Sequence, residues 1–341
     1  MYDAVDRGLA SLLIGQSPAI ERVRSLIRKV GPSSLPVLVQ GPTGSGKELV
    51  ARALHLASGR TGAFVAFNVC SIADTIFEDT LFGHVRGAFT GALSDAKGYL
   101  MESDRGSLFL DEISGLPLAS QAKLLRAVET KEFRPIGAPR DRQSDFRLIS
   151  ATNEPLSEVA HSGRFRVDLL YRLRGAVIEL PSLMDRMEDV PLLARFFAAA
   201  TLNQHGREAE LTDDAIDALL HHDWPGNVRE LRAVVQCSIA LSDRESVSRA
   251  DCLRAALLSR EQRQTVSRRE DFDARRLLEA LEQTAWDIEA AALMLGIHRA
   301  TVYRRLSRIH GVSLRARSNA GRLKSMMQNH PPIMSTGSAE P

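Results

Sequence analysis

Residues 35–54 constrain the fold of this chain more than any other stretch. The apolar run Val37–Val39 is followed by a glycine-rich loop and then by an amphipathic helical pattern. Glycines let a backbone curl until its N–H groups face one centre, where a helix N-terminus and a lysine add positive charge. The loop consists of Gly41, Pro42, Thr43, Gly44, Ser45, Gly46 and Lys47. The pattern predicts a phosphate-binding loop between a strand and a helix.

The residue after the lysine departs from the general pattern of such loops. A serine or threonine that binds Mg²⁺ usually stands there, and this chain has Glu48 instead. The alternative is a glycine-rich turn that only begins a helix. We disfavour it because the strand, the spacing and the lysine are all present.

A second apolar run ends in two acidic residues. Residues 107–110 precede Asp111 and Glu112, and Asp111 follows Lys47 by 64 residues. Asp111 is suited to hold Mg²⁺, directly or through water, and Glu112 to polarise the water that attacks the γ-phosphate of ATP. A strand end followed by a solvated turn is the alternative, but the position relative to the loop favours the catalytic interpretation.

Composition narrows the class of protein. Of the 341 residues, 44% are apolar and 25% are charged, as in globular proteins of two or three domains. No apolar run approaches a membrane span and no signal peptide opens the chain, so we expect a cytoplasmic protein without membrane contact. Cys70, Cys237 and Cys252 are too widely spaced to indicate a disulfide framework or a zinc site.

Basic charge is concentrated near the C-terminus. Residues 291–330 hold eight Lys or Arg and no Asp or Glu, which leaves 36 basic against 42 acidic residues elsewhere. Two helices are expected here, over 288–295 and 298–309, separated by Gly296. This pattern predicts a helix-turn-helix that binds DNA. A small helical protein–protein module is the alternative, and the unopposed basic charge weighs against it.

The second of these helices supplies the expected DNA contacts. Val302 and Leu306 face inward at i, i+4, so the other face is exposed. We expect His298 and Arg299, at the start of the helix, to meet base edges. Thr301, Arg304 and Arg305 are expected to meet phosphates.

Residues 81–92 contain three glycines that break any helix. From the residues alone, a protruding loop with Phe89 at its tip and a tight turn with a buried Phe89 are about equally favoured. The motif Gly87, Ala88, Phe89, Thr90, Gly91, Ala92 resembles the signature loop of the bacterial enhancer-binding activators of sigma-54 RNA polymerase. This family belongs to the AAA+ ATPases, and the resemblance covers about residues 14–310. We refer to residues 87–92 as the signature loop.

The resemblance assigns further roles at the ATP site. Phosphate loops of this family commonly end in Gly-Lys-Glu, which accounts for Glu48. Asn68, after the apolar run 64–67, would hold Glu112 until the site is engaged. Thr152 and Asn153 would form the first sensor of the γ-phosphate. Arg229, in the motif 224–231, would be the second sensor, closing a lid over the phosphates; an Arg229 that pairs with a surface acid is the alternative.

The resemblance also implies an oligomer. Arg166 and Arg172, spaced by six as in the family, would reach the nucleotide of the neighbouring subunit. From the sequence alone they would be solvated surface arginines. The protein is then expected to be a homo-oligomer, a hexamer when active and a dimer when inactive. In the hinge motif, residues 181–186 here, Met184 stands where the family has an arginine.

Together these features predict an AAA+ α/β P-loop domain with a parallel sheet, a helical lid and a separate all-α helix-turn-helix domain. The expected boundaries are an N-terminal extension (1–13), the α/β subdomain (14–181), the lid (182–258), a linker (259–272), the Fis-type DNA-binding domain (273–312) and a disordered tail (313–341). The extension leaves no room for an upstream regulatory domain, so we expect control by expression level or by an inhibitor or regulator protein in trans.

The resemblance implies an activator that binds enhancer DNA and uses ATP and Mg²⁺ to remodel the sigma-54 RNA polymerase holoenzyme and open the promoter. The first alternative is a DNA-binding regulator of the same architecture that acts without remodelling. The second is an AAA+ machine that acts on other proteins or on DNA, such as an unfoldase or a helicase loader. The intact signature loop speaks against both.

Overall fold

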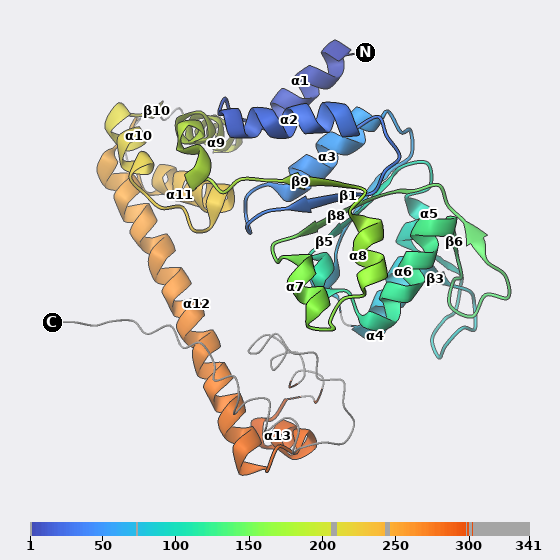
Figure 1. Ribbon diagram of the computed structural model, residues 1–341. Helices are drawn as coiled ribbons and strands as arrows, with labels where there is room; N and C mark the ends of the chain where they lie inside the picture. Colours follow the sequence, from blue (N-terminus) through green and yellow to red (C-terminus); the bar gives the residue numbers. More distant parts are fainter. Residues whose placement is uncertain are drawn as a thin grey trace. The chain divides into compact units, whose positions relative to one another are not determined.

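Five parallel strands form the central sheet of the protein (Figure 1). The structure is a computed structural model that describes residues 2–72, 74–205, 210–242 and 246–297, together with 299 and 302. The strand order is β2-β5-β8-β1-β9. The strands are β1 (Val37–Gln40), β2 (Phe64–Asn68), β5 (Ser107–Asp111), β8 (Arg147–Thr152) and β9 (Ala176–Glu179). The predicted parallel-sheet α/β class is confirmed.

Helices cover both faces of this sheet, as Figure 1 shows. On one face lie α1 (Tyr2–Leu12), α2 (Pro18–Val30) and α3 (Lys47–Ser58). On the other lie α4 (Asp74–Phe82), α5 (Tyr99–Glu102), α6 (Leu118–Thr130), α7 (Leu156–His161) and α8 (Val167–Leu173). Val37 and Val39 pack towards the first set and Leu38 towards the second, so β1 is buried on both sides. Such burial explains why its sequence is continuously apolar.

The lid is helical, as expected, with one addition. Its elements are η3 (Met184–Asp189), α9 (Val190–His205), α10 (Asp213–Leu220), α11 (Asn227–Leu241) and the first part of α12 (Arg249–Gln283). They pack around Trp224, which is almost fully buried. Two short strands not predicted from the sequence, β10 (Glu210–Leu211) and β11 (Ser246–Val247), pair in parallel beside this core.

Two hairpins lie beyond the strands of the main sheet. The first consists of β3 (Gly83–His84) and β4 (Ala96–Lys97), and the signature loop belongs to their connection. The second consists of β6 (Glu132–Phe133) and β7 (Arg142–Gln143). Ile136 joins the two hairpins: its carbonyl accepts a hydrogen bond from Val85 N–H at 3.1 Å, and its N–H donates to Gly83 O at 2.8 Å. The signature loop is thus anchored at its base by a neighbouring loop.

The chain divides into two compact units, Met1–Ser259 and Arg260–Pro341. Residues 259–272, expected to form a linker because they carry no core pattern, lie within the helix α12. The helix was not predicted because the segment has no apolar stripe. Arg, Glu and Gln are nevertheless good helix formers without one. In the second unit, the first helix of the predicted helix-turn-helix is present as α13 (Ile288–Leu295), and Gly296 ends it in a left-handed conformation (φ +65°).

Two smaller expectations concern the described part of the chain. None of its helices is long and apolar enough to span a membrane. None of the three cysteines, all of them described, forms a disulfide bond.

Candidate nucleotide site

The predicted site residues meet at the carboxyl edge of the sheet. Asn68 at the end of β2 lies beside Asp111 at the end of β5. Gln40, the last residue of β1, lies beside Thr152 at the end of β8. Gly41 N–H then donates to Thr152 O at 3.2 Å, so the phosphate loop starts next to the residues predicted to sense its ligand. Ligands of parallel α/β sheets bind at this edge.

The loop of residues 41–47 has the backbone that a phosphate cradle requires. Gly44 and Gly46 adopt positive φ values of +77° and +109°, which other residues rarely tolerate. Lys47 begins α3 and is only 7% exposed. Its ammonium group donates to Gly41 O at 3.0 Å and to Pro42 O at 3.4 Å. Burial lowers the pKa of Lys47, and the nearby Glu112 and Asp111 partly oppose this shift. An anionic ligand would stabilise the charged ammonium.

The two acids lie next to this lysine. Glu112 has a left-handed backbone (φ +54°), and its N–H donates to the Asp111 carboxylate at 3.0 Å. Burial raises the pKa of the Glu112 carboxyl; Lys47 lowers it, while Asp111 and Glu154 add to the increase. A carboxylate with a raised pKa beside a buried cation is suited to accept a proton from water. Glu154 was not identified from the sequence, because an exposed glutamate after a strand carries no distinctive pattern.

Asn68 and Glu48 make contacts other than those expected. The Asn68 side chain accepts a hydrogen bond from Cys70 N–H at 2.9 Å, and within the described residues it makes none to Glu112. The exposed Glu48 pairs with Arg52, one turn along α3, at 2.8 Å. Neither contact involves the centre of the site, so the roles of Asn68 and Glu48 remain predictions.

The two residues assigned to the first sensor differ in exposure. Thr152 is fully buried, and its hydroxyl accepts from Glu154 N–H at 3.0 Å, which shapes the turn after β8. Asn153 is exposed and its amide donates to the Thr43 hydroxyl at 3.1 Å. Asn153 therefore contacts the phosphate loop directly.

The lid brings Arg229 to the same place. Its backbone N–H donates to Gly44 O at 3.1 Å, and its charge acts on the pKa of both Lys47 and Glu112. The side chain is exposed and has no ion pair within the described chain, unlike the alternative in which it bonds a surface acid. The helix α11 begins at Asn227, two residues after Pro225.

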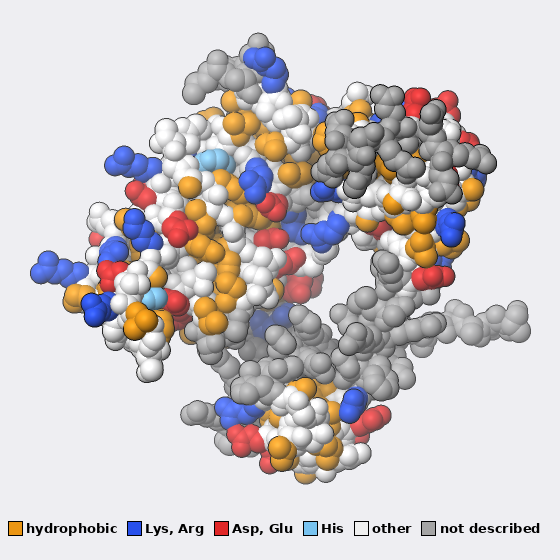
Figure 2. Space-filling model, turned by 180° about the vertical axis from the view of Figure 1, so that it is seen from behind, with side chains coloured by type: hydrophobic (Ala, Val, Ile, Leu, Met, Phe, Trp, Pro, Cys, Tyr) orange, Lys and Arg blue, Asp and Glu red, His pale blue; other side chains and the backbone are white. Residues whose placement is uncertain are grey.

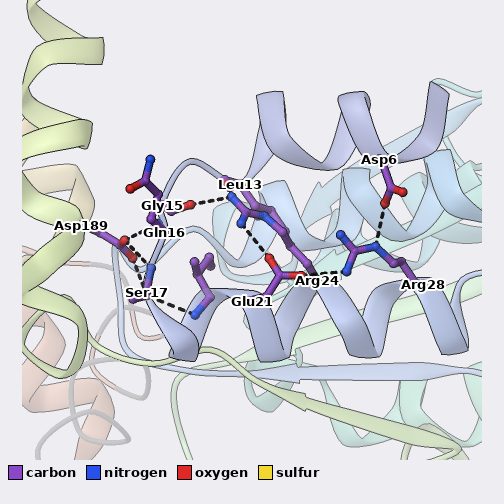
Figure 3. A network of polar contacts seen from close by, with 10 residues as sticks. Asp6, Leu13, Gly15, Gln16, Ser17, Glu21, Arg24, Arg28 and Asp189 are labelled. Atoms are coloured by element: carbon purple, nitrogen blue, oxygen red, sulfur yellow. Dashed lines mark hydrogen bonds and ion pairs between the residues drawn. The ribbon is translucent and has the colours of Figure 1, made fainter. Parts of the chain in front are cut away.

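Three buried lid residues were missed from the sequence. The Asn227 amide donates to Thr43 O at 3.0 Å, and the Arg186 guanidinium donates to Ser45 O at 3.0 Å. Asp189 accepts from Gln16 N–H at 2.6 Å and from Ser17 N–H at 2.8 Å (Figure 3). Asn227 lies in the motif of Arg229, and the other two lie in or next to the hinge motif. These motifs were noted, but hydrogen-bond partners on a distant backbone leave no signal in a sequence.

The N-terminal segment is held by a further polar network (Figure 3). Arg24 of α2 donates to Gly15 O at 2.8 Å and to Leu13 O, and it pairs with Glu21 at 3.0 Å. Arg28 pairs with Glu21 at 2.8 Å and with Asp6 of α1 at 2.7 Å. This network joins the residues before α2 to the helices that cover the sheet.

Of the predicted interface arginines, Arg166 precedes α8 and Arg172 lies in its last turn, and both are exposed. Arg166 forms a bidentate pair with Asp168, with nitrogen–oxygen distances of 3.0 and 2.7 Å. Arg172 has no ion pair within the described chain. Arg172 is thus available to a neighbouring molecule, whereas Arg166 would first have to release Asp168.

The signature loop is turned on itself and exposed. Gly87 N–H donates to Ala92 O at 2.9 Å, and Ala92 N–H donates to Phe89 O at 3.0 Å. Phe89 is 46% exposed and meets His84 edge-on, with ring centroids 4.9 Å apart. A buried Phe89, the alternative drawn from the residues alone, is therefore wrong. Thr90 is also exposed.

The predicted DNA-contacting residues are only partly described. Val302 is fully buried, as expected for the inward face of the second helix. Arg299 is exposed and pairs with Glu289 of α13 at 2.5 Å. Outside the described residues lie the other four, His298, Thr301, Arg304 and Arg305, and the tail 313–341.

On the face seen in Figure 2, basic and acidic side chains are interspersed over the first unit.

Three family models match successive parts of the chain. Residues 13–179 match the sigma-54 interaction domain, and residues 184–270 match the AAA+ ATPase lid domain. Residues 268–308 match the bacterial regulatory protein, Fis family. Together they describe a nucleotide-binding AAA+ domain joined to a DNA-binding helix-turn-helix.

Known proteins share this arrangement. The transcriptional regulatory protein ZraR of Salmonella typhimurium is 40% identical over 301 residues, which cover 87% of this chain and 68% of ZraR. The C4-dicarboxylate transport regulator DctD of Rhizobium meliloti is 39% identical, with 91% and 66% covered. The crystal structure of NtrX from Brucella abortus in complex with ATP has a TM-score of 0.65 and 32% identity, with 87% and 68% covered.

The chain therefore belongs to the family of sigma-54-dependent transcriptional activators, with an AAA+ ATPase domain, its lid and a Fis-type helix-turn-helix. The predicted family is confirmed. Members of this family are ATPases that regulate transcription.

Proposed function

We propose that this protein binds enhancer DNA through its C-terminal unit and hydrolyses ATP in an oligomeric ring, a hexamer, to remodel the sigma-54 RNA polymerase holoenzyme and open the promoter. The observation that carries the proposal is the signature loop. It is intact, it is exposed at Phe89 and Thr90, and it holds no acid, base or metal ligand. Such a loop is suited to contact a protein partner and contributes nothing to the chemistry of hydrolysis.

The ATP site supplies the chemistry. The N–H groups of the 41–47 loop and the charge of Lys47 would bind the phosphates. Asp111 would hold Mg²⁺, directly or through water, which neutralises charge on the phosphates. Glu112 would take a proton from the attacking water. The raised pKa of its carboxyl and its position beside Lys47 support this role.

The remaining predicted residues respond to the γ-phosphate. Asn153 contacts the phosphate loop, and Arg229 lies over it from the lid. Arg166 and Arg172 would act on the nucleotide of the adjacent subunit, which makes assembly part of catalysis. Asn68 lies beside Asp111 in the sheet and would hold Glu112 until the site is engaged.

The substitution Thr90→Ala tests the proposal. It removes a hydroxyl and a methyl group from the exposed loop and leaves the ATP site intact. We expect ATP turnover within about twofold of the parent, unchanged DNA binding and loss of transcription from a sigma-54 promoter. Thr61→Ala, the same change at an exposed position before β2, is the matched control and should activate normally.

The outcomes separate the competing functions. Full activation by Thr90→Ala would contradict the role of the loop. A parent protein that hydrolyses ATP and binds DNA but never activates a sigma-54 promoter would favour the regulator that acts without remodelling.

A further inference from the structure

Three consecutive carbonyl groups of the phosphate loop accept hydrogen bonds from the lid. For residues 43 to 45 in order, the donors are the Asn227 side-chain amide at 3.0 Å, the Arg229 backbone N–H at 3.1 Å and the Arg186 guanidinium at 3.0 Å. In a trans peptide the C=O and the next N–H point in opposite directions. Holding these carbonyls therefore turns the N–H groups of residues 44, 45 and 46 away from the lid donors.

Asn227 is built for this contact. It is 4% exposed, and its backbone is left-handed (φ +53°), a conformation that Asn adopts more readily than most residues. Its side-chain oxygen accepts from Leu183 N–H at 2.8 Å while its amide donates to Thr43 O at 3.0 Å. Because one partner is a donor and the other an acceptor, the orientation of the amide is fixed. One side chain thus joins the hinge of the lid to the phosphate loop.

The two backbones touch at this point. A Cβ atom built on Gly44 would lie 2.3 Å from Gly226 O. The approach is too close for any side chain, so Gly44 is needed for the lid contact as well as for its positive φ of +77°.

The short helix η3 supplies the third donor and is anchored on both sides. Arg186 is 4% exposed, and its Nε has no hydrogen-bond partner within the described residues. Asp189, three residues on, is fully buried and holds the N–H groups of Gln16 and Ser17 at 2.6 and 2.8 Å (Figure 3). Burial lowers the pKa of Arg186, and the charge of Asp189 opposes this shift. Two buried charges of opposite sign thus fix η3 between α2 and the phosphate loop.

We propose that the lid is a template for the phosphate loop, with Asn227 and Arg186 as positioning residues that set the direction of its N–H groups. The inference rests on the proposed function only in taking this site to bind ATP. Neither side chain is required to touch the nucleotide. Loss of either contact should therefore lower the affinity for the phosphates and leave the affinity for the nucleoside unchanged.

The test uses the full chain with Asn227→Gly, which tolerates the left-handed backbone and removes both side-chain hydrogen bonds. Affinities for ADP and for adenosine are measured by competition against a fluorescent ADP analogue. We expect ADP to bind about tenfold more weakly and adenosine to bind as it does to the parent. Arg232→Ala, at an exposed position of the same helix α11, is the control and should match the parent for both ligands.

Equal losses for ADP and adenosine would overturn the proposal, because they indicate a general loss of the lid. Unchanged affinity for ADP would overturn it as well. If Asn227→Gly does not fold, Arg186→Lys is used, which keeps the buried charge and loses the planar guanidinium. It should lower the ratio of ADP to adenosine affinity, and an unchanged ratio would contradict the proposal. A parent protein that binds no ADP would instead refute the ATPase assignment.

Discussion

Lys47 and Glu112 share a partly buried site. Burial lowers the pKa of Lys47 and raises that of Glu112, so it favours the neutral form of each. Each charge partly offsets the shift of the other. Phosphates would add negative charge beside the lysine, and a cation held by Asp111 would add positive charge beside the glutamate. At the scale of single residues, we therefore propose that the charges of the site would be balanced best with a metal–nucleotide complex bound.

Substitutions at these two residues should separate binding from hydrolysis. Lys47→Ala removes the charge that compensates the phosphates, so ATP binding should fall by at least about tenfold. Glu112→Gln keeps the shape and cannot accept a proton, so ATP should bind and remain intact. Equilibrium binding and phosphate release measure the two steps. Turnover by Glu112→Gln at the parent rate would show that Glu112 is not the base.

The pH profile of hydrolysis tests the electrostatics directly. Glu112 must be deprotonated to act as a base, and its pKa is raised above the ordinary 4.5. On acidification, ATP hydrolysis should therefore be lost at a higher pH than it would be if the base were an exposed glutamate with an ordinary pKa. The negative charge of Glu154 contributes to this rise. Glu154→Gln should move the acid limb of kcat/KM to lower pH; a limb that stays in place or moves upward would contradict this account.

At the scale of elements, α8 carries the predicted contribution to a neighbouring subunit. Arg172 lies in its last turn, exposed and without an ion pair in the described chain, while Arg166 at its start is held by Asp168. Among the described residues, neither side chain forms a hydrogen bond or ion pair with the phosphate loop or with Glu112. Action of the two arginines on the nucleotide of an adjacent subunit is our proposal.

Mixing two inactive variants tests this arrangement. Arg172→Ala should bind ATP and lose most turnover, and Lys47→Ala should lose turnover because it cannot bind. In mixed rings, some interfaces combine the intact pocket of the Arg172→Ala subunit with the arginine of the Lys47→Ala subunit. These interfaces should recover part of the ATPase activity. Mixed rings that form and show no recovery would count against action in trans.

At the scale of the whole molecule, the sequence predicted the strands and their ends well. The apolar runs before Gly41, Asn68 and Asp111 are local patterns, and a parallel sheet brings their ends to one edge. The lid contacts were not predicted. Asn227 and Thr43 lie 184 residues apart, and a backbone carbonyl accepts from any donor without requiring a particular residue type.

The helical nature of residues 259–272 was missed for another reason. Prediction relied on an apolar stripe, and this segment is polar on all sides. A polar segment rich in Arg, Glu and Gln forms a helix on propensity. The same absence of pattern is compatible with a loop, so only the structure distinguishes the two.

The measurement that tests the central claim most directly is promoter opening. The parent protein, sigma-54 holoenzyme and a template carrying a sigma-54 promoter and its enhancer are combined with ATP or with a non-hydrolysable analogue, and unpaired thymines are detected by permanganate. We predict unpaired bases at the promoter with ATP and none with the analogue. Opening with the analogue, or no opening with ATP, would contradict the claim that this chain couples ATP hydrolysis to remodelling of the sigma-54 holoenzyme.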